Sequence, residues 1–206
     1  MTPGDGSPLY HEGSRELQDR FDSRRIADRL EVVNVRTDFV DEQREIIDAS
    51  AMFFLATADA EGWPDVSYKG GLPGFVRVVG PSEVAFPSYD GNGMFKSLGN
   101  VLVNPRVGML FIRFGDAPRR VRVQGRASIS YDDPLMADWE GAQLVVRVQA
   151  ERIFFNCPRY VHRIELAEYS VYTPQAGHTP PVPDWKRRPE YRDALPARDL
   201  AEDHER

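Results

Sequence analysis

Hydrophobic positions change their spacing along the chain, and the change marks a passage from helical to β structure. From Ser14 to about Val33, apolar residues recur at near-helical intervals among charged ones, which predicts a single amphipathic helix lying on the body of the protein. A second helix is expected to begin at the N-cap residue Asp38 and to run to about Ala49. After Ser50 the pattern is that of strands.

Short apolar or alternating runs, separated by glycine and proline turns, fill the chain as far as residue 130. They predict six strands, over 51–58, 64–69, 75–79, 83–87, 106–114 and 119–130, and a helix over 94–104. The first two strands are expected to pair through the turn at 59–63, and the strand from residue 64 is expected to form a hairpin with 75–79. Six such strands with one helix between them predict a closed or partly closed barrel.

The last third of the chain has a less regular pattern. A helix is expected over 132–142, a strand within 144–156 and another over 159–166, followed by an extended proline-rich tail in which Trp185 is a candidate anchor. The fold class is therefore mainly β (α+β). The expected organisation is an N-terminal arm and helix (1–36, mobile over 1–13), a barrel domain (37–170) and a Pro-rich, charged C-terminal tail (171–206).

Composition narrows the range of partners and compartments. With 26 basic and 32 acidic residues the net charge is −6, which argues against a protein built to coat nucleic acid or an anionic membrane. No apolar run approaches the roughly 20 residues that cross a bilayer. Cys157 has no second cysteine to pair with, and the first ten residues lack a secretory signal, so we expect a cytoplasmic protein.

Polar side chains suited to a phosphate occur at two places in the predicted barrel. The period of two along a strand puts Ser67 and Lys69 on one face of it. Lys96 and Ser97 fall in the first turn of the predicted helix, where free N–H groups and the helix dipole favour an anion. If the two pairs converge, they provide the phosphate site that flavin mononucleotide (FMN) requires.

Four segments, in this order, resemble the flavin-binding split barrels of the pyridoxamine 5'-phosphate oxidase-like superfamily. They are PDVSYKGGLPGFVRV, AFPSYDGNGMFKSLGNVLVNPRVGMLF, RRVRVQGRASI and FFNCPRYVHR, and the resemblance covers roughly residues 48–166. It implies a split β-barrel of the FMN-binding type with flanking helices. It also implies a homodimer with the cofactor at the subunit interface.

The resemblance also implies which residues bind FMN. In the family the first strand and the start of the helix hold the phosphate, the strand ending at Ser88 lies near the ribityl chain, and Arg120 stands where many relatives place a glutamine facing the flavin ring. The implied cofactor-binding residues are Ser67, Tyr68, Lys69, Pro87, Ser88, Asn92, Lys96, Ser97 and Arg120.

The implied function is that of an FMN-dependent oxidoreductase acting on a small organic substrate. The flavin supplies the redox chemistry, so no catalytic residue is assigned. The arginine-rich phosphate clamp of true pyridoxamine phosphate oxidases is reduced here to Lys96, and that specific activity is not implied. The alternatives are a non-catalytic flavin or haem carrier, a deazaflavin-dependent reductase, and a structural dimer with an empty site.

Simpler interpretations exist for several of these residues. Lys69 can be a solvated hairpin residue, and Arg122 and Arg126 fit a salt-bridged barrel exterior. Cys157 and His162 fall short of a zinc-binding set, so no metal is expected, and Cys157 is interpreted as a buried structural thiol.

Overall fold

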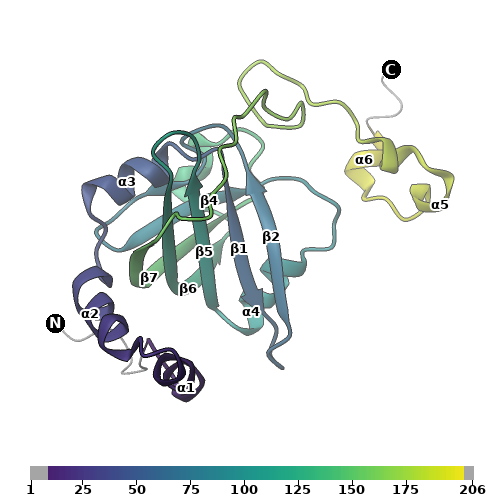
Figure 1. Cartoon of the computed structure of the whole chain (residues 1–206). Helices are drawn as coiled ribbons and strands as arrows, with labels where there is room; N and C mark the ends of the chain where they lie inside the picture. The colour runs from purple at the N-terminus through teal and green to yellow at the C-terminus, as the bar shows by residue number, and fades with distance from the viewer. Residues whose placement is uncertain (1–8, 202–206) are drawn as a thin grey trace.

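Seven strands form one antiparallel sheet in the part of the chain that the computed structural model describes, residues 9–201. They are β1 (Met52–Ala58), β2 (Pro64–Gly70), β3 (Arg77–Val78), β4 (Glu83–Ser88), β5 (Arg106–Arg113), β6 (Arg119–Ser130) and β7 (Leu144–Asn156). Their order is β2-β1-β5-β6-β7-β4-β3, and the sheet curves into a barrel that stays open between its edge strands β2 and β3 (Figure 1). The prediction of a mainly β split barrel with flanking helices is confirmed.

Alternation of buried and more exposed residues along β5 and β6 places the core on one face of the sheet. In β6, Val121 and Val123 are fully buried, whereas Arg122 and Arg126 are exposed on the opposite face. Arg126 pairs with Glu151 at 2.9 Å, which confirms its interpretation as an exterior salt bridge.

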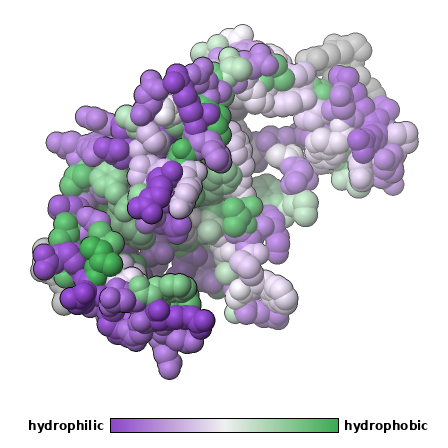
Figure 2. Space-filling model, in the orientation of Figure 1, coloured by the Kyte–Doolittle hydropathy of each residue, from purple (hydrophilic) through white to green (hydrophobic). Residues whose placement is uncertain are grey.

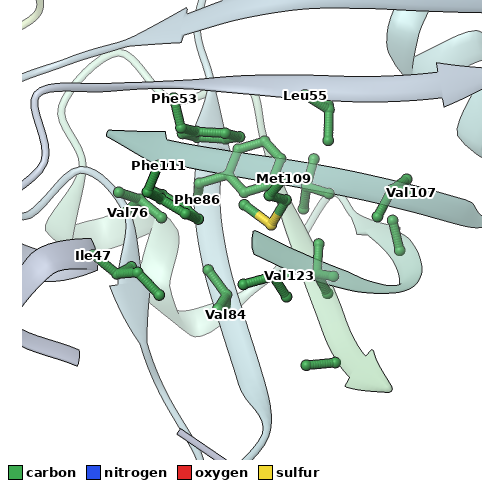
Figure 3. Close-up of a cluster of buried hydrophobic side chains, with 14 of the residues drawn as sticks. Ile47, Phe53, Leu55, Val76, Val84, Phe86, Val107, Met109, Phe111 and Val123 are labelled. Carbon is green, nitrogen blue, oxygen red and sulfur yellow. The ribbon is translucent and has the colours of Figure 1, made fainter. Parts of the chain in front are cut away.

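The centre of the core is aromatic (Figure 3). The Phe53 ring lies 5.0 Å from that of Phe86 and 5.1 Å from that of Phe111, in edge-on and stacked geometry. All three side chains are almost completely buried, so this cluster joins β1, β4 and β5.

A glycine lets the two longest strands bend around this core. The register between β6 and β7 shifts at Gly125, and a Cβ atom there would lie 2.1 Å from the carbonyl oxygen of Gln149. Only glycine permits so close an approach of two backbones. The irregularity allows β7 to pair with β6 along its length while its first half also pairs with β4.

Helix α3 (Asp41–Asp48) covers one end of the barrel with Ile46 and Ile47. It begins three residues after the predicted start at Asp38. The N–H of the buried Phe39 donates to the Pro81 carbonyl, and the N-cap residue Val40 is extended, with its N–H donating to the Gln43 side chain at 3.1 Å.

The single N-terminal helix predicted for residues 14–33 is wrong. The segment forms α1 (Glu12–Arg20) and α2 (Arg24–Asn34), separated at Asp22, which has φ 48°. An ion pair of 2.5 Å between Arg15 and Asp28 holds the two helices together.

The prediction that the apolar side of this segment packs on the body of the protein is also wrong. Phe21 is 73% exposed and Ile26 is 55% exposed, and Ala27 is the one buried residue of the two helices. Figure 2 shows hydrophobic side chains on the surface in the region of α2.

The predicted hairpin between the strand from residue 64 and the segment 75–79 is also wrong, because β2 pairs with β1 and β3 pairs with β4. Phe75 and Val76 are buried in the core, so only Arg77–Val78 is left to extend beside β4. Glycine residues in the connection carry the chain from one edge of the sheet to the other: the Gly71 N–H donates to Ala51, and the Gly74 N–H donates to Asp48.

The region after β6 differs from expectation in four respects. The expected helix over 132–142 is a short 3-10 helix, η2 (Pro134–Asp138), and the expected strand over 159–166 has no regular structure because no strand pairs with it. The tail is not simply extended: it contains η3 (Asp184–Arg187), α5 (Pro189–Arg192) and α6 (Ala197–Ala201). Cys157 is exposed, since it follows the last residue of β7.

Helix α4 (Lys96–Val103) begins two residues later than predicted and packs against β1 and β2. Between residues 9 and 201, no helix combines the length and the apolar character needed to cross a membrane.

Candidate functional site

A cavity of about 230 Å³ opens where the C-terminal ends of β2 and β4 approach α4. It lies beside the edge strand β2, and three of its lining residues, Phe75, Phe86 and Leu98, also belong to the hydrophobic core. The lining residues are Tyr68, Lys69, Gly70, Phe75, Phe86, Pro87, Ser88, Tyr89, Asp90, Gly91 and Leu98. The lining therefore combines apolar side chains with an ammonium, hydroxyls and a carboxylate.

The two predicted phosphate-binding segments meet at this cavity. The Lys69 Nζ donates to the Ser97 Oγ at 3.0 Å, which joins β2 to the first turn of α4. Ser97 is buried, and burial lowers the pKa of Lys69, although the charge of Asp65 acts in the opposite direction. The expectation that these two pairs of residues converge is met by Lys69 and Ser97.

The first turn of α4 leaves its N–H groups without a side-chain cap. The N-cap residue Phe95 has φ 46°, and it makes no side-chain hydrogen bond to the helix. Asn92, predicted to bind the cofactor, instead accepts a hydrogen bond from the Met94 N–H at 3.0 Å and shapes the approach to the helix. Lys96 is exposed and lies outside the cavity lining.

The hydroxyl of Ser67 faces the same side of β2 as Lys69 but lies deeper. Its Oγ is buried and has no hydrogen-bond partner within residues 9–201. Ser67 does not line the cavity, whereas the predicted residues Tyr68, Pro87 and Ser88 do. Buried hydroxyls are almost always hydrogen-bonded, so an unpaired one beside a buried lysine is unusual.

Arg120 lies on the outer face of the sheet and does not line the cavity of its own chain. It is paired in register with Asn156, and its guanidinium donates to the Cys157 carbonyl. Three buried polar atoms on this face have no partner in the described part of the chain: Arg120 Nε, Gln124 Oε1 and Asn156 Oδ1. The predicted role of Arg120 at a flavin ring would thus involve the site of another subunit, and it stays a prediction.

Sequence reasoning missed Tyr89 and Asp90. Burial raises the pKa of Tyr89. Burial also opposes ionisation of Asp90, but hydrogen bonds from Lys186 and Arg198 outweigh it and leave the Asp90 pKa below its usual value. The glycine-rich context SYDGNG marks this segment as a loop, and no local pattern indicates its distant cationic partners.

Comparison with known proteins gives one family and several structural likenesses. Residues 39–157, more than half of the chain, match the pyridoxamine 5'-phosphate oxidase family. No curated protein matches the sequence.

The similar solved structures include a putative pyridoxamine 5'-phosphate oxidase from Lactobacillus delbrueckii, with 23% identity and a TM-score of 0.45 over 58% of this chain and 95% of that one. An FAD-binding protein from Mesorhizobium loti has 21% identity and a TM-score of 0.44 over 59% and 94%. HutZ, a haem storage protein from Vibrio cholerae, has 20% identity and a TM-score of 0.40 over 53% and 87%.

Proposed function

Because the chain belongs to the pyridoxamine 5'-phosphate oxidase family, we propose that its cavity binds FMN and that the protein is an FMN-dependent oxidoreductase acting on a small organic substrate. Lys69 and Ser97 hold the phosphate, with the free N–H groups at the start of α4. Pro87 and Ser88 line the path of the ribityl chain.

The contact between Lys69 and Ser97 carries the proposal. Lys69 is largely withdrawn from water, and within residues 9–201 it forms no ion pair with a carboxylate. Burial of an ammonium is unfavourable, and the attraction of Asp65 does not fully offset it, so the pKa of Lys69 is lowered. A phosphate dianion at this position supplies the missing charge and accepts hydrogen bonds from both side chains.

The cavity of one chain is too small to bury the whole ligand. Its volume of about 230 Å³ lies below the roughly 300–1,000 Å³ of typical small-molecule sites. We therefore extend the proposal to a homodimer in which the outer sheet face of one copy, including Arg120, completes the site of the other. Val66 and Tyr68, on the outer face of β2, are 67% and 62% exposed, which supports an apolar contact there.

The types of side chain in the cavity indicate which roles belong to the protein and which to FMN. FMN, when bound, supplies the transfer of electrons to or from the substrate. The protein binds the phosphate, excludes water with Phe75 and Phe86, and offers Tyr89 and Ser88 as hydrogen-bonding groups. No side chain of the cavity is needed as a nucleophile.

A haem carrier is the main alternative, and the lining disfavours it. Haem iron is usually held by histidine, cysteine or methionine, and none of these lines the cavity within residues 9–201. Among the described lining residues, only Tyr68 and Tyr89 have a side chain of a type that occurs as an axial ligand, and that of Tyr68 lies on the outer face of β2.

Titration of the ligand-free wild-type protein with FMN, riboflavin and haemin, followed by flavin fluorescence and the visible spectrum, tests the proposal. We expect FMN to bind at least tenfold more tightly than riboflavin, since a charge-assisted phosphate contact is worth about 1.5–3 kcal/mol. A protein that binds haemin but not FMN, or that binds FMN and riboflavin equally, contradicts it.

A further inference from the structure

The C-terminal tail reaches the wall of the cavity through one carboxylate. Asp90 lines the cavity, and its Oδ2 accepts a hydrogen bond from Lys186 Nζ at 2.8 Å. Its Oδ1 accepts from Arg198 at 2.8 Å and from Gln143 at 3.2 Å. In Figure 1 the yellow C-terminal helices accordingly lie beside the loop that leads into α4. Asp90 is thus joined at the cavity wall to Lys186, which lies 96 positions further along the chain, and to Arg198, which lies 108 positions further along.

Lys186 is built into this contact rather than resting on the surface. Its side chain is only 8% exposed, and its ammonium also donates to Asp199 at 2.9 Å, whose side chain is 11% exposed. The same ammonium lies 5.8 Å from the centre of the Trp185 ring. Lysine is almost never buried unless it is paired, and here Asp90, Asp199 and the Trp185 ring together form a specific binding site for the ammonium.

The loop that Asp90 anchors has little else to hold it. Residues 90–96 are exposed, and the segment contains Gly91 and Gly93, the latter with φ 75°. Tyr89, Asp90 and Gly91 nevertheless form part of the cavity wall. The position of this wall therefore depends on the partners of Asp90: Gln143 from the barrel and two cations from the tail.

We propose that residues 184–199 form a clasp that holds the loop 89–93 against the cavity, and that ligand exchange requires Lys186 and Arg198 to release Asp90. Lys186 is a positioning residue, since it acts on the ligand through Asp90. The clasp lies outside residues 39–157, so membership of the family does not supply it. The effect of the clasp on FMN release rests on the function proposed above. The contact of the clasp with Asp90 in the ligand-free protein does not depend on that function.

The rate of FMN release measures the clasp directly. Full-length protein loaded with FMN is diluted, and the recovery of flavin fluorescence gives the dissociation rate. We expect Lys186→Met and Asp90→Asn each to raise this rate at least about tenfold, since Lys186→Met removes the ion pairs with Asp90 and Asp199, and Asp90→Asn removes those with Lys186 and Arg198. The double variant should release FMN no faster than the faster single one, because both changes open the same contact.

Arg187→Gln is the matched control. It removes a positive charge from the next residue of η3, whose side chain is 60% exposed and whose ion-pair partner in the described part of the chain is Asp184, at 4.0 Å. We expect it to leave the rate unchanged. An unchanged rate in Lys186→Met, or fully additive effects in the double variant, would overturn the clasp as a barrier to exchange.

Limited digestion with trypsin, without ligand, tests the clasp independently of FMN. We expect cleavage after the exposed Arg187 to be at least several-fold faster in Lys186→Met than in the wild-type protein, because the released tail reaches the protease more often; the bond after Arg188 precedes Pro189 and resists trypsin in both proteins. Equal cleavage rates would show that the tail is not held and would overturn the proposal. If wild-type protein fails to bind FMN, the proposed function fails, and this comparison still decides whether the clasp exists.

Discussion

Replacing Lys69 by alanine removes the only ammonium that lines the cavity within the described residues. The same change leaves the Ser97 hydroxyl and the N–H groups of α4 in place, so the site keeps its shape but loses its buried positive charge. The barrel itself should tolerate the substitution, because Lys69 lies at the end of the edge strand β2.

The size of the effect follows from the contact. A hydrogen bond from a charged group to a phosphate contributes about 1.5–3 kcal/mol, which corresponds to a loss of FMN affinity of about 10- to 150-fold. Because the Lys69 ammonium is withdrawn from water, screening by solvent is weak and we expect the upper half of that range. Riboflavin has no phosphate, so its affinity should change less than about threefold.

Titration of the ligand-free protein by flavin fluorescence gives both affinities. Lys96→Ala is the matched control: Lys96 is exposed and outside the cavity lining, so its removal should weaken FMN binding much less, by under about fivefold. If Lys69→Ala binds FMN as tightly as the wild-type protein, or loses FMN and riboflavin equally, the assignment of Lys69 to the phosphate is wrong.

Three further predictions concern the scaffold. Phe53→Ala should lower the free energy of unfolding by about 3–5 kcal/mol in urea titration, because Phe53 is fully buried among aromatic rings, and a loss below about 1 kcal/mol would contradict that packing. The hydrogen bonds from Arg147 lower the pKa of Asp133, so this pair should stabilise the protein above about pH 4 and lose its effect as the pH falls through the Asp133 pKa. In Asp133→Asn the free energy of unfolding should therefore fall less steeply on acidification than in the wild-type protein. Cys157→Ser should leave FMN binding unchanged because the thiol is exposed, and a loss of binding with the fold intact would point to a role for the thiol.

The parts of the fold that local patterns determine were predicted correctly. The alternation in β6, the apolar run of β1 and the turn between β1 and β2 are properties of neighbouring residues, and these three strands lie within one residue of the predicted bounds, while β7 fills the segment in which a strand was expected. Alternation along the strand from residue 64 placed Lys69 on one face with Ser67, and the predicted helix start placed Ser97 in a first turn, so a convergence of the two segments could be anticipated.

The parts that depend on distant partners could not be read from the chain. The segment 75–79 has strand-like residues, but burial of Phe75 and Val76 in the core decides its course. The apolar side of α1 and α2 predicted packing on the barrel, yet no local signal reveals that it stays exposed. The contact of Lys186 with Asp90 joins positions 96 residues apart, and neither residue stands in a recognisable pattern.

The central claim, that this cavity holds the phosphate of FMN, is tested most directly by a crystal structure of the protein with FMN bound. The account predicts phosphate oxygens about 2.7–2.9 Å from Lys69 Nζ and within hydrogen-bond distance of Ser97 Oγ, with the outer sheet face of a second copy over the ring. A phosphate bound away from β2 and α4, or FMN lying outside the cavity, would contradict it.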